Sequence, residues 1–280
     1  MKRVDLHLHS NCSDGSDTVV ELYENIKKAG LEVFALTDHD TVEGCLEMSK
    51  LISNNIKFIP SVELTCRADD IKCHILGYNC DYTDLTLLNL IKKGKELRHK
   101  KLETRLNYLK ERWQIFLTQE ELDWLYSRKS VVKTHVANVL VNRGLAPDNL
   151  SAMGKYLDGC KTGDTRFNIR EAIDVIKKSG GIPVWAHPLG GEGETHLSKE
   201  EFLLKLKTMK DYGIRGLECF YSRYSIEESE FLVNCAKANN LLISAGSDYH
   251  GTNKSNIEIG KLNINRLPIG IEKINILEYL

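Results

Sequence analysis

Hydrophobic and polar positions along the first third of the chain alternate between short apolar runs and longer amphipathic segments. Val4–Leu8 and Val33–Thr37 are short runs typical of buried strands. Thr18–Ala29, which lies between them, has helical spacing and ends at Gly30, and Glu43–Ser53 predicts the next helix. This order of strand, loop and helix predicts a parallel α/β architecture.

The same pattern continues through two more short apolar runs and then stops. Lys57–Leu64 and Cys73–Tyr78 predict strands, because each is bounded by polar turn residues. From about residue 83 to residue 126, Leu, Lys, Glu and Arg recur at helical spacing, and 135–142 predicts another helix. We therefore assign residues 83–165 to a mainly helical insertion that caps the barrel mouth.

Alternation of strands and helices resumes after the insertion. The predicted elements are a helix over Ile169–Ser179, strands over Ile182–Ala186, Gly216–Phe220 and Leu241–Gly246, and a helix over Glu227–Asn239. Residues 1–82 and 166–280 are thus expected to form one α/β barrel interrupted by the insertion. In such barrels the active site is built where the strands end, because the loops that follow the strands converge there.

Composition and charge exclude several classes of protein. With 38 Lys and Arg against 39 Asp and Glu, the chain has no overall positive field that would hold a long polyanion. Its eight cysteines are scattered without a C-x-x-C pair, and no run of about 18 apolar residues occurs. We expect a cytoplasmic protein with reduced thiols, no membrane segment and no obligate protein partner. The basic stretch 92–105 contains interleaved glutamates and predicts a solvated helix face.

Histidines and carboxylates recur where the predicted strands end. His7 and His9 are two residues apart on a strand, so both side chains project from the same face and can bind one metal ion. An isolated pair of this kind can also be two hydrogen-bonded histidines. The other residues at equivalent places are His39, His74, His187, His250, Asp14, Asp38, Asp40, Glu63 and Asp248. Their recurrence predicts a cluster of divalent metal ions.

These residues lie in motifs that resemble those of the PHP (polymerase and histidinol phosphatase) family. The motifs are residues 7–10 with 13–15, residues 37–41, the strand of Glu63, residues 73–75, 186–188 and 246–250. The resemblance covers residues 2–78 and 167–260. It implies a distorted (β/α)7 barrel that holds two or three metal ions where its strands end.

The resemblance also implies a set of metal ligands. They are His7, His9, Glu63 and Asp248 for a first ion, Glu63, His74 and His187 for a second, and Asp14, His39 and His250 for a third. Many family members have a histidine at the position of Asp14. The ions are expected to be manganese, zinc, iron or magnesium. Because a carboxylate is a harder ligand than imidazole, the third site, which contains Asp14, is expected to favour manganese or magnesium.

The metal ions in this family imply hydrolysis by an activated water, without a nucleophile from the protein. Asp248 and Asp38 are candidate proton acceptors, and His187 and His250 are candidates to lie near the leaving group. For Asp38 a supporting role is favoured, in which it orients His39 or caps the helix that follows.

Candidate substrate-binding residues lie in two regions. By local similarity to the family's cap motifs, His135 and Lys161 are expected to bind substrate phosphates, with Arg143 and Arg166 as further candidates. Ser222 and Arg223 follow the predicted strand 216–220 and are expected to face the barrel mouth. The alternative for each basic residue is an ordinary solvated side chain.

The leading functional prediction is metal-dependent hydrolysis of a small phosphorylated substrate. The family branch that the chain resembles implies a nucleoside 3′,5′-bisphosphate, another nucleotide, or the 5′ end of a short oligonucleotide. The first alternative is a histidinol-phosphate phosphatase. The second is a metal-binding module without catalytic activity, which the presence of ligating residue types at all nine positions disfavours.

Overall fold

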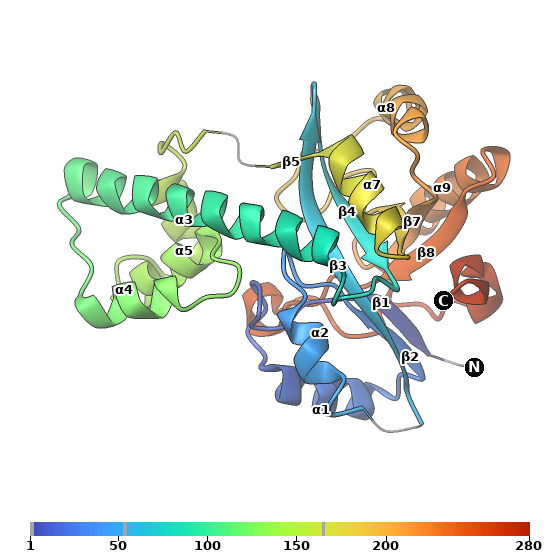
Figure 1. The fold of residues 1–280 in the computed structure, drawn as a ribbon, viewed down its shortest axis with the longest axis horizontal. Helices are drawn as coiled ribbons and strands as arrows, with labels where there is room; N and C mark the ends of the chain where they lie inside the picture. Colours follow the sequence, from blue (N-terminus) through green and yellow to red (C-terminus); the bar gives the residue numbers. More distant parts are fainter. Residues whose placement is uncertain (1–2, 53–54, 164–165) are drawn as a thin grey trace.

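The computed structural model describes residues 3–52, 55–163 and 166–280, and its centre is one curved sheet (Figure 1). The strands are β1 (Val4–Leu8), β2 (Val33–Leu36), β3 (Lys57–Ala68), β4 (Ile71–Tyr78), β5 (Phe167–Asn168), β6 (Ile182–Trp185), β7 (Gly216–Tyr221) and β8 (Leu242–Gly246). Their order is β1-β2-β3-β4-β6-β7-β8, and β5 pairs with β3. A bridge between Leu8 and Tyr249 brings the first and last strands together, so the sheet is barrel-like and nearly closed.

One strand runs against the predicted direction. The pairs β1–β2, β2–β3, β6–β7 and β7–β8 are parallel, whereas β4 is antiparallel to both β3 and β6. Only Asp69 and Asp70 separate β3 from β4, and a connection this short can form a hairpin but not a crossover. The hairpin places His74 opposite Thr65, two residues beyond Glu63.

Helices pack around the barrel between the strands (Figure 1). They are α1 (Val19–Ala29), α2 (Glu43–Met48), α7 (Ile169–Lys178), α8 (Lys199–Asp211) and α9 (Ile226–Ala238). Helix α1 begins with a capping box between Thr18 and Glu21 and ends at Gly30, whose φ of 68° favours glycine. Helix α2 ends earlier than predicted, and Ser53 at the end of the predicted helix lies outside the described residues.

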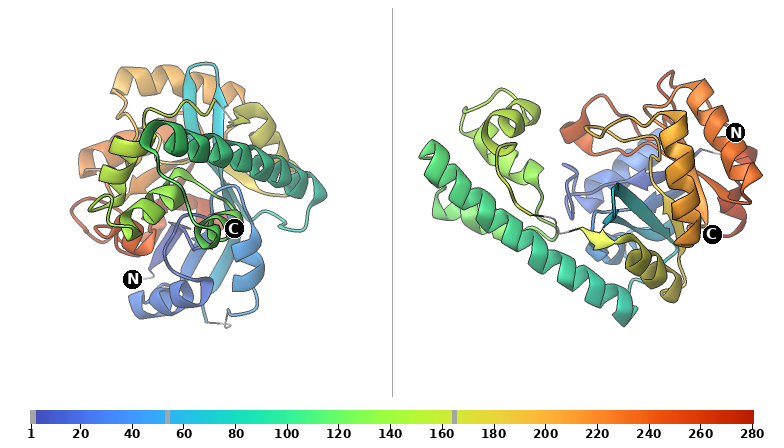
Figure 2. Two further views of the ribbon diagram at one scale, coloured as in Figure 1. Left: turned by 90° about the vertical axis from the view of Figure 1, so that its left-hand side faces the viewer. Right: turned by 90° about the horizontal axis from the view of Figure 1, so that it is seen from above.

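The segment between β4 and β5 is helical and projects from the barrel, as the right-hand view of Figure 2 shows. It contains α3 (Leu85–Trp113), α4 (Gln119–Tyr126), α5 (Lys133–Asn142), α6 (Asn149–Ala152) and a π-helical turn over Met153–Leu157. Its helices share a small core of their own that includes Leu102, Leu109, Leu125, Val136 and Leu140. Residues 164 and 165, at the predicted end of the insertion, lie outside the described part of the chain.

The main hydrophobic core fills the space between the sheet and the barrel helices. Leu6, Leu64 and Ile75 from the strands and Ile173 from α7 are fully buried in it. Burial of each such side chain contributes about 1.5–3 kcal/mol, so this core holds the strand ends in fixed positions. After β8 the chain forms short 3-10 turns over Gly251–Lys254, Ile271–Lys273 and Asn275–Glu278. Within the described ranges, every helix is too short or too polar to cross a lipid bilayer.

Candidate metal centre

All nine predicted ligands lie together on one side of the barrel. His7 and His9 belong to β1 or directly follow it, Asp14 lies in the loop after β1, and His39 follows β2. Glu63, His74, His187, Asp248 and His250 come from β3, β4 and the residues after β6 and β8. Together with Glu194, these side chains form four overlapping sets within which the ligand atoms lie within 4.8 Å of one another. The contacts of the carboxylates Asp248, Glu63 and Asp14 divide the nine predicted ligands into three groups.

The first group joins β1 to β3 and to the loop after β8. Nε2 of His7 and Nε2 of His9 each lie 3.2 Å from Oε2 of Glu63. Oδ1 of Asp248 lies 3.6 Å from the His7 nitrogen and 3.4 Å from the His9 nitrogen. Two imidazoles and two carboxylates therefore face one small space.

The second group uses the other oxygen of Glu63. Its Oε1 lies 3.1 Å from Nδ1 of His74 and 3.2 Å from Nε2 of His187. Because Oε2 faces His7 and His9, the two oxygens of one buried carboxylate are shared between two groups of nitrogen ligands. This is the geometry that a carboxylate bridging two metal ions requires.

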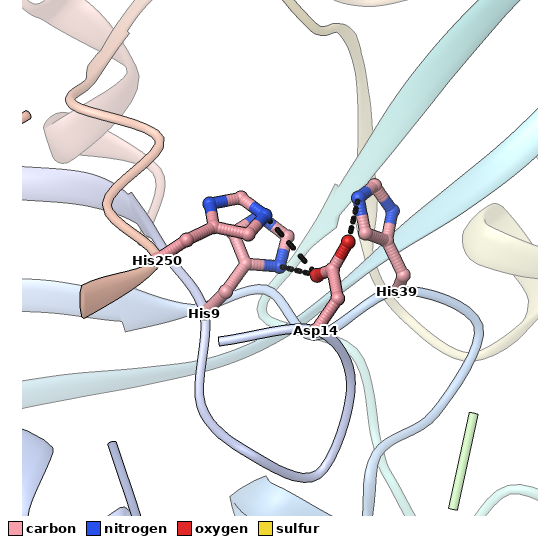
Figure 3. Close-up of side chains that lie close together, drawn as sticks. All are labelled: His9, Asp14, His39 and His250. Carbon is pink, nitrogen blue, oxygen red and sulfur yellow. Dashed lines mark ion pairs between the residues drawn. The ribbon is translucent and has the colours of Figure 1, made fainter. Parts of the chain in front are cut away.

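The third group surrounds Asp14 (Figure 3). Oδ1 of Asp14 lies 3.1 Å from Nε2 of His250 and 3.8 Å from Nδ1 of His9. Oδ2 lies 3.9 Å from Nε2 of His39, whose Nδ1 is 3.1 Å from Glu63. His9 and His39 therefore each face two groups, so the three groups form one continuous cluster.

Buried atoms without hydrogen-bond partners show that this cluster fits metal ions. The atoms are Nε2 of His7 and His9, Nδ1 of His39, Oδ1 of Asp14 and Oε2 of Glu63. A buried polar atom without a partner is costly, and a bound cation satisfies the lone pairs of nitrogen and carboxylate oxygen together. Histidine with carboxylate is the donor set that suits zinc, manganese and iron.

Opposite charges within the cluster shift its pKa values. Burial raises the pKa of Glu63, but His39 and His7 outweigh burial and hold it well below its usual range. Burial lowers the pKa of His9, but the nearby carboxylates of Asp248 and Glu63 outweigh burial and raise it to about 9. The carboxylates are therefore ionised, and His9 holds a proton that metal binding displaces.

Two further carboxylates, those of Glu218 and Glu194, contact the rings of His7 and His187. Oε1 of Glu218 lies 2.9 Å from Nδ1 of His7, and Oε2 accepts the backbone N–H of His187 at 2.7 Å. Oε2 of Glu194 lies 3.1 Å from Nδ1 of His187. A carboxylate hydrogen-bonded to Nδ1, as Glu218 is to His7, selects the tautomer that leaves Nε2 free for a metal ion. Glu194 forms a group with His74 and His187 that could itself hold an ion. Sequence reasoning missed both. Glu218 lies inside an apolar strand, which is a usable signal, whereas Glu194 lies in a glycine-rich loop that carries none.

Asp248 is held by two residues besides the cluster. While Oδ1 faces the histidines, Oδ2 accepts hydrogen bonds from Tyr221 Oη at 3.0 Å and from Lys254 Nζ at 2.7 Å. Asp248 and His187 also have positive φ angles of 61° and 29°, which are uncommon for residues other than glycine. Lys254 was not among the predicted site residues, and only the turn after β8 brings it back to the cluster.

Asp38 is bound to the loop after β1 rather than to the cluster. Its Oδ1 accepts hydrogen bonds from Ser10 N at 2.8 Å and Ser13 Oγ at 2.6 Å, and its Oδ2 accepts one from Ser10 Oγ at 2.7 Å. A Cβ at Gly44 would lie 2.3 Å from Oδ2, so only glycine lets α2 approach this closely. These contacts give Asp38 a supporting role, since they fix the loop that carries Asp14.

A cleft of about 340 Å³ opens onto the cluster. The ligands that line it are Asp14, His39, Glu63, His74, His187, Asp248 and His250. Thr134, Leu150 and Met153 of the helical insertion form another wall, and Lys254 adds a cation. The cleft is therefore bounded by both parts of the chain.

The predicted substrate residues of the insertion lie in different surroundings. His135 is buried, its Nδ1 accepts the Val132 N–H at 3.0 Å, and burial lowers its pKa to about 4. Arg143 pairs with both oxygens of Glu121, at 2.6 and 2.5 Å. Lys161 is exposed. The structure does not bring Arg143 to the cleft, because Glu121 holds it within the insertion.

The remaining predicted substrate residues lie beside two other cavities. Arg166 lines one that adjoins His187. Ser222 and Arg223 line one on the far side of the loop after β7. Nη1 of Arg223 also pairs with Oε1 of Glu192 at 2.9 Å, which ties two loops at the barrel mouth together.

The basic stretch of α3 differs from the solvated face that its sequence predicts. Lys92 and Lys100 are exposed, but Arg98 points inward, pairs with Asp40 and donates to Thr65 Oγ1 at 3.0 Å. The reason is that α3 continues past the barrel rim, so one of its faces meets the loop after β2. Arg98 links the helical insertion to the residue that follows His39.

An α/β barrel with a cluster of histidines and carboxylates where its strands end is an architecture of metal-dependent hydrolases, and comparison with known proteins specifies the family. The model of the PHP domain matches residues 5–178, more than half of the chain. The chain belongs to the PHP domain family.

Named relatives and a solved structure agree with this family. The chain is 30% identical over 252 residues to the 5′-3′ exoribonuclease Rnm of Escherichia coli (strain K12), covering 88% of this chain and 84% of the relative. It is 25% identical to a 3′,5′-nucleoside bisphosphate phosphatase of Chromobacterium violaceum, covering 93% and 91%. A structure described as an amidohydrolase from Chromobacterium violaceum, with bound sulfate and no metal, superimposes with a TM-score of 0.80 at 25% identity, covering 92% and 90%. The predicted family, the α/β barrel and the phosphoesterase class are confirmed.

Proposed function

We propose that the protein hydrolyses phosphate esters of nucleotides, either a nucleoside 3′,5′-bisphosphate or the 5′ end of a short oligonucleotide. The observation that carries this proposal is the divided carboxylate of Glu63, with one oxygen toward His7 and His9 and the other toward His74 and His187. A shared carboxylate of this kind supports a centre of more than one ion. The names of the relatives support nucleotide substrates over histidinol phosphate.

Two or three divalent ions, manganese, zinc, iron or magnesium, are the cofactors that this proposal requires. When bound, such ions supply an activated water and neutralise charge on the phosphate oxygens. The nine clustered residues would hold them, with Glu63 shared between the first two sites. Glu218 and Glu194 keep the rings of His7 and His187 in orientations that present Nε2 to the cluster.

The chain's own residues then position the reacting groups. Tyr221 and Lys254 hold Oδ2 of Asp248, so Oδ1 stays directed at the cluster and can accept a proton there. His187 lies where the cleft meets a second cavity, which suits a group close to the leaving oxygen. Asp38 acts through the loop of Asp14 in this proposal, as a positioning residue.

The helical insertion, residues 83–165, acts in this proposal as a cap that restricts the substrate. Thr134, Leu150 and Met153 line the cleft beside the clustered ligands, which supports such a role. The eight cysteines have free thiols, which is in keeping with a reducing compartment such as the cytoplasm.

The test is hydrolysis of a panel of substrates, each with manganese, zinc, iron or magnesium, measured as release of inorganic phosphate and, for short RNA, also as release of nucleoside monophosphates. The panel contains nucleoside bisphosphates, nucleoside monophosphates, 5′-phosphorylated short RNA and histidinol phosphate. The proposal expects the highest kcat/KM with a nucleotide substrate and loss of activity in Glu63→Gln. A preference for histidinol phosphate would favour the first alternative, and metal binding without any turnover would favour the non-catalytic module.

A further inference from the structure

A second cavity of about 380 Å³ adjoins the metal centre on the other side of the loop after β6. Its walls come from the start of β4, from Arg166 before β5, from the loop after β6 and from α8. It shares His187, Gly193 and Glu194 with the cleft over the cluster. A substrate with its reacting phosphate at the cluster could therefore extend into this cavity past a single loop.

Three cations line the cavity, and they come from three separate segments. They are Lys72 of β4, Arg166 before β5 and Lys205 of α8. Neither Lys72 nor Lys205 forms an ion pair with a carboxylate among the described residues. Two ammonium groups without paired carboxylates at one cavity favour an anionic ligand.

Two acidic residues, Glu194 and Asp70, also line the cavity. Glu194 is directed at His187, and that contact lowers its pKa. Asp70, in the tight turn between β3 and β4, is the other acid that lines the cavity. Cys73, Arg166 and Lys205 all line this cavity, so the two cations lie at the same cavity wall.

The aromatic residue at the cavity is not available as a platform for a base. Trp185 is 3% exposed and stacks against Phe202 in the core, with ring centroids 5.5 Å apart. Base stacking needs an accessible ring face. The chemistry that the cavity offers is therefore charge rather than stacking, which suits a phosphate better than a nucleobase.

We propose that this cavity binds the phosphate of the substrate that is not cleaved, through Lys72, Lys205 and Arg166. The ligand is a phosphate-class anion, either the second phosphate of a nucleoside bisphosphate or the next phosphodiester of a short oligonucleotide. This inference rests on the proposed function of the metal centre and specifies which substrates that centre prefers.

The test compares substrates with and without the second phosphate. Lys72→Ala combined with Lys205→Ala should lower kcat/KM for adenosine 3′,5′-bisphosphate by about 10- to 100-fold, the usual effect of removing charge-assisted contacts. The value for adenosine 5′-monophosphate should stay within about twofold of wild type. Lys207→Ala is the matched control, because Lys207 is exposed on the same helix as Lys205 and does not line the cavity.

A binding measurement makes the test independent of turnover. Calorimetric titration of chelator-treated protein with adenosine 3′,5′-bisphosphate should show weaker binding in the double variant and unchanged binding in Lys207→Ala. A 5′-phosphorylated dinucleotide forms the second arm. A loss with the bisphosphate alone assigns the cavity to bisphosphates, and a loss with the dinucleotide alone assigns it to the next phosphodiester.

Three outcomes would overturn the inference. One is an equal loss of kcat/KM on the bisphosphate and the monophosphate, and another is no loss on either substrate or in binding. The third is a selective loss in Lys161→Ala that the cavity variant does not show. Failure of the proposed function would look different from failure of this inference. In that case the metal-loaded wild-type protein would hydrolyse no phosphate ester in the panel.

Discussion

Nζ of Lys254 donates a hydrogen bond to Oδ2 of Asp248 at 2.7 Å, within the cleft that opens onto the cluster. Burial lowers the pKa of Lys254, but the charge of Asp248 outweighs burial and raises it, so the ammonium stays charged. The contact holds the outer oxygen of Asp248 while its inner oxygen faces His7 and His9. The orientation of one predicted metal ligand thus depends on a residue outside the ligand set.

We predict that Lys254→Ala lowers kcat/KM. The loss of transition-state stabilisation should be about 1.5–3 kcal/mol, the range for a hydrogen bond between charged groups. Asp248 would keep only Tyr221 on its outer oxygen and could rotate away from the cluster. Steady-state kinetics together with metal analysis would check this. Lys254→Arg should recover part of the activity, and Lys237→Ala on the surface of α9 serves as a control. Unchanged kinetics in Lys254→Ala would mean that Tyr221 alone holds the carboxylate.

A second prediction concerns the divided carboxylate. Glu63→Gln keeps the size of the side chain but replaces one oxygen with an NH₂ group, which cannot bind a cation. The variant should bind fewer metal ions per chain and lose several kcal/mol of transition-state stabilisation, about 10³-fold or more in kcat. Elemental analysis beside kcat would test both effects. A variant that keeps its full metal content would contradict the bridging role.

Removal of metal should lower the stability of the folded protein. A ligand that binds only the folded state stabilises it by about 2.7 kcal/mol when its concentration is 100 times Kd. Chelation should therefore lower the melting temperature, and addition of manganese or zinc should restore it in a concentration-dependent way. Scanning calorimetry with and without chelator would measure the shift. An unchanged melting temperature would indicate that the cluster binds no ion under those conditions.

Metal binding should also depend on pH, and the direction follows from two histidines. The pKa of His9 is raised to about 9 by Asp248 and Glu63, and that of His187 to about 10 by Glu194, in each case against the effect of burial. Protonation of these rings stabilises the metal-free fold fully below pH about 6.5, the unfolded value, and this contribution is lost as pH rises through 9 to 10.

As the pH rises from about 6.5 to between 9 and 10, the metal-free protein should become less stable. Metal affinity should rise over the same pH range, because fewer protons must be displaced. Calorimetric titration at pH 7 in buffers of different ionisation enthalpy should detect protons released on binding. No release at that pH would show that the histidines are neutral before metal binds.

The contact between α3 and the barrel gives a further prediction. The side chain of Arg98 is 14% exposed and pairs with Asp40, so its removal leaves a buried carboxylate without its cation. Arg98→Ala should lower the free energy of unfolding by about 3–5 kcal/mol, the usual cost of breaking a buried pair. Urea unfolding would measure this, with exposed Lys100→Ala on the same helix as the control. A change of less than about 1 kcal/mol would place the pair among the surface ion pairs.

Much of the candidate site could be predicted from the sequence because the residues of the cluster recur at one kind of position. An apolar run followed by a histidine or carboxylate marks the end of a strand, and the loops after parallel strands converge on one side of a barrel. His7, His39, His187 and His250 all follow this rule. Local spacing thus determined which residues are available as ligands and that they meet.

Only the tertiary structure decided which residues support these ligands and how the surroundings are charged. The two-residue turn that reverses β4, the return of Lys254 to Asp248 and the contact of Glu194 with His187 depend on packing between distant segments. Arg98 shows the same limit, because an amphipathic pattern gives the polar face of a helix but not what that face meets. Lys72 and Lys205 lie 133 residues apart in sequence, and only folding brings their charges to one cavity.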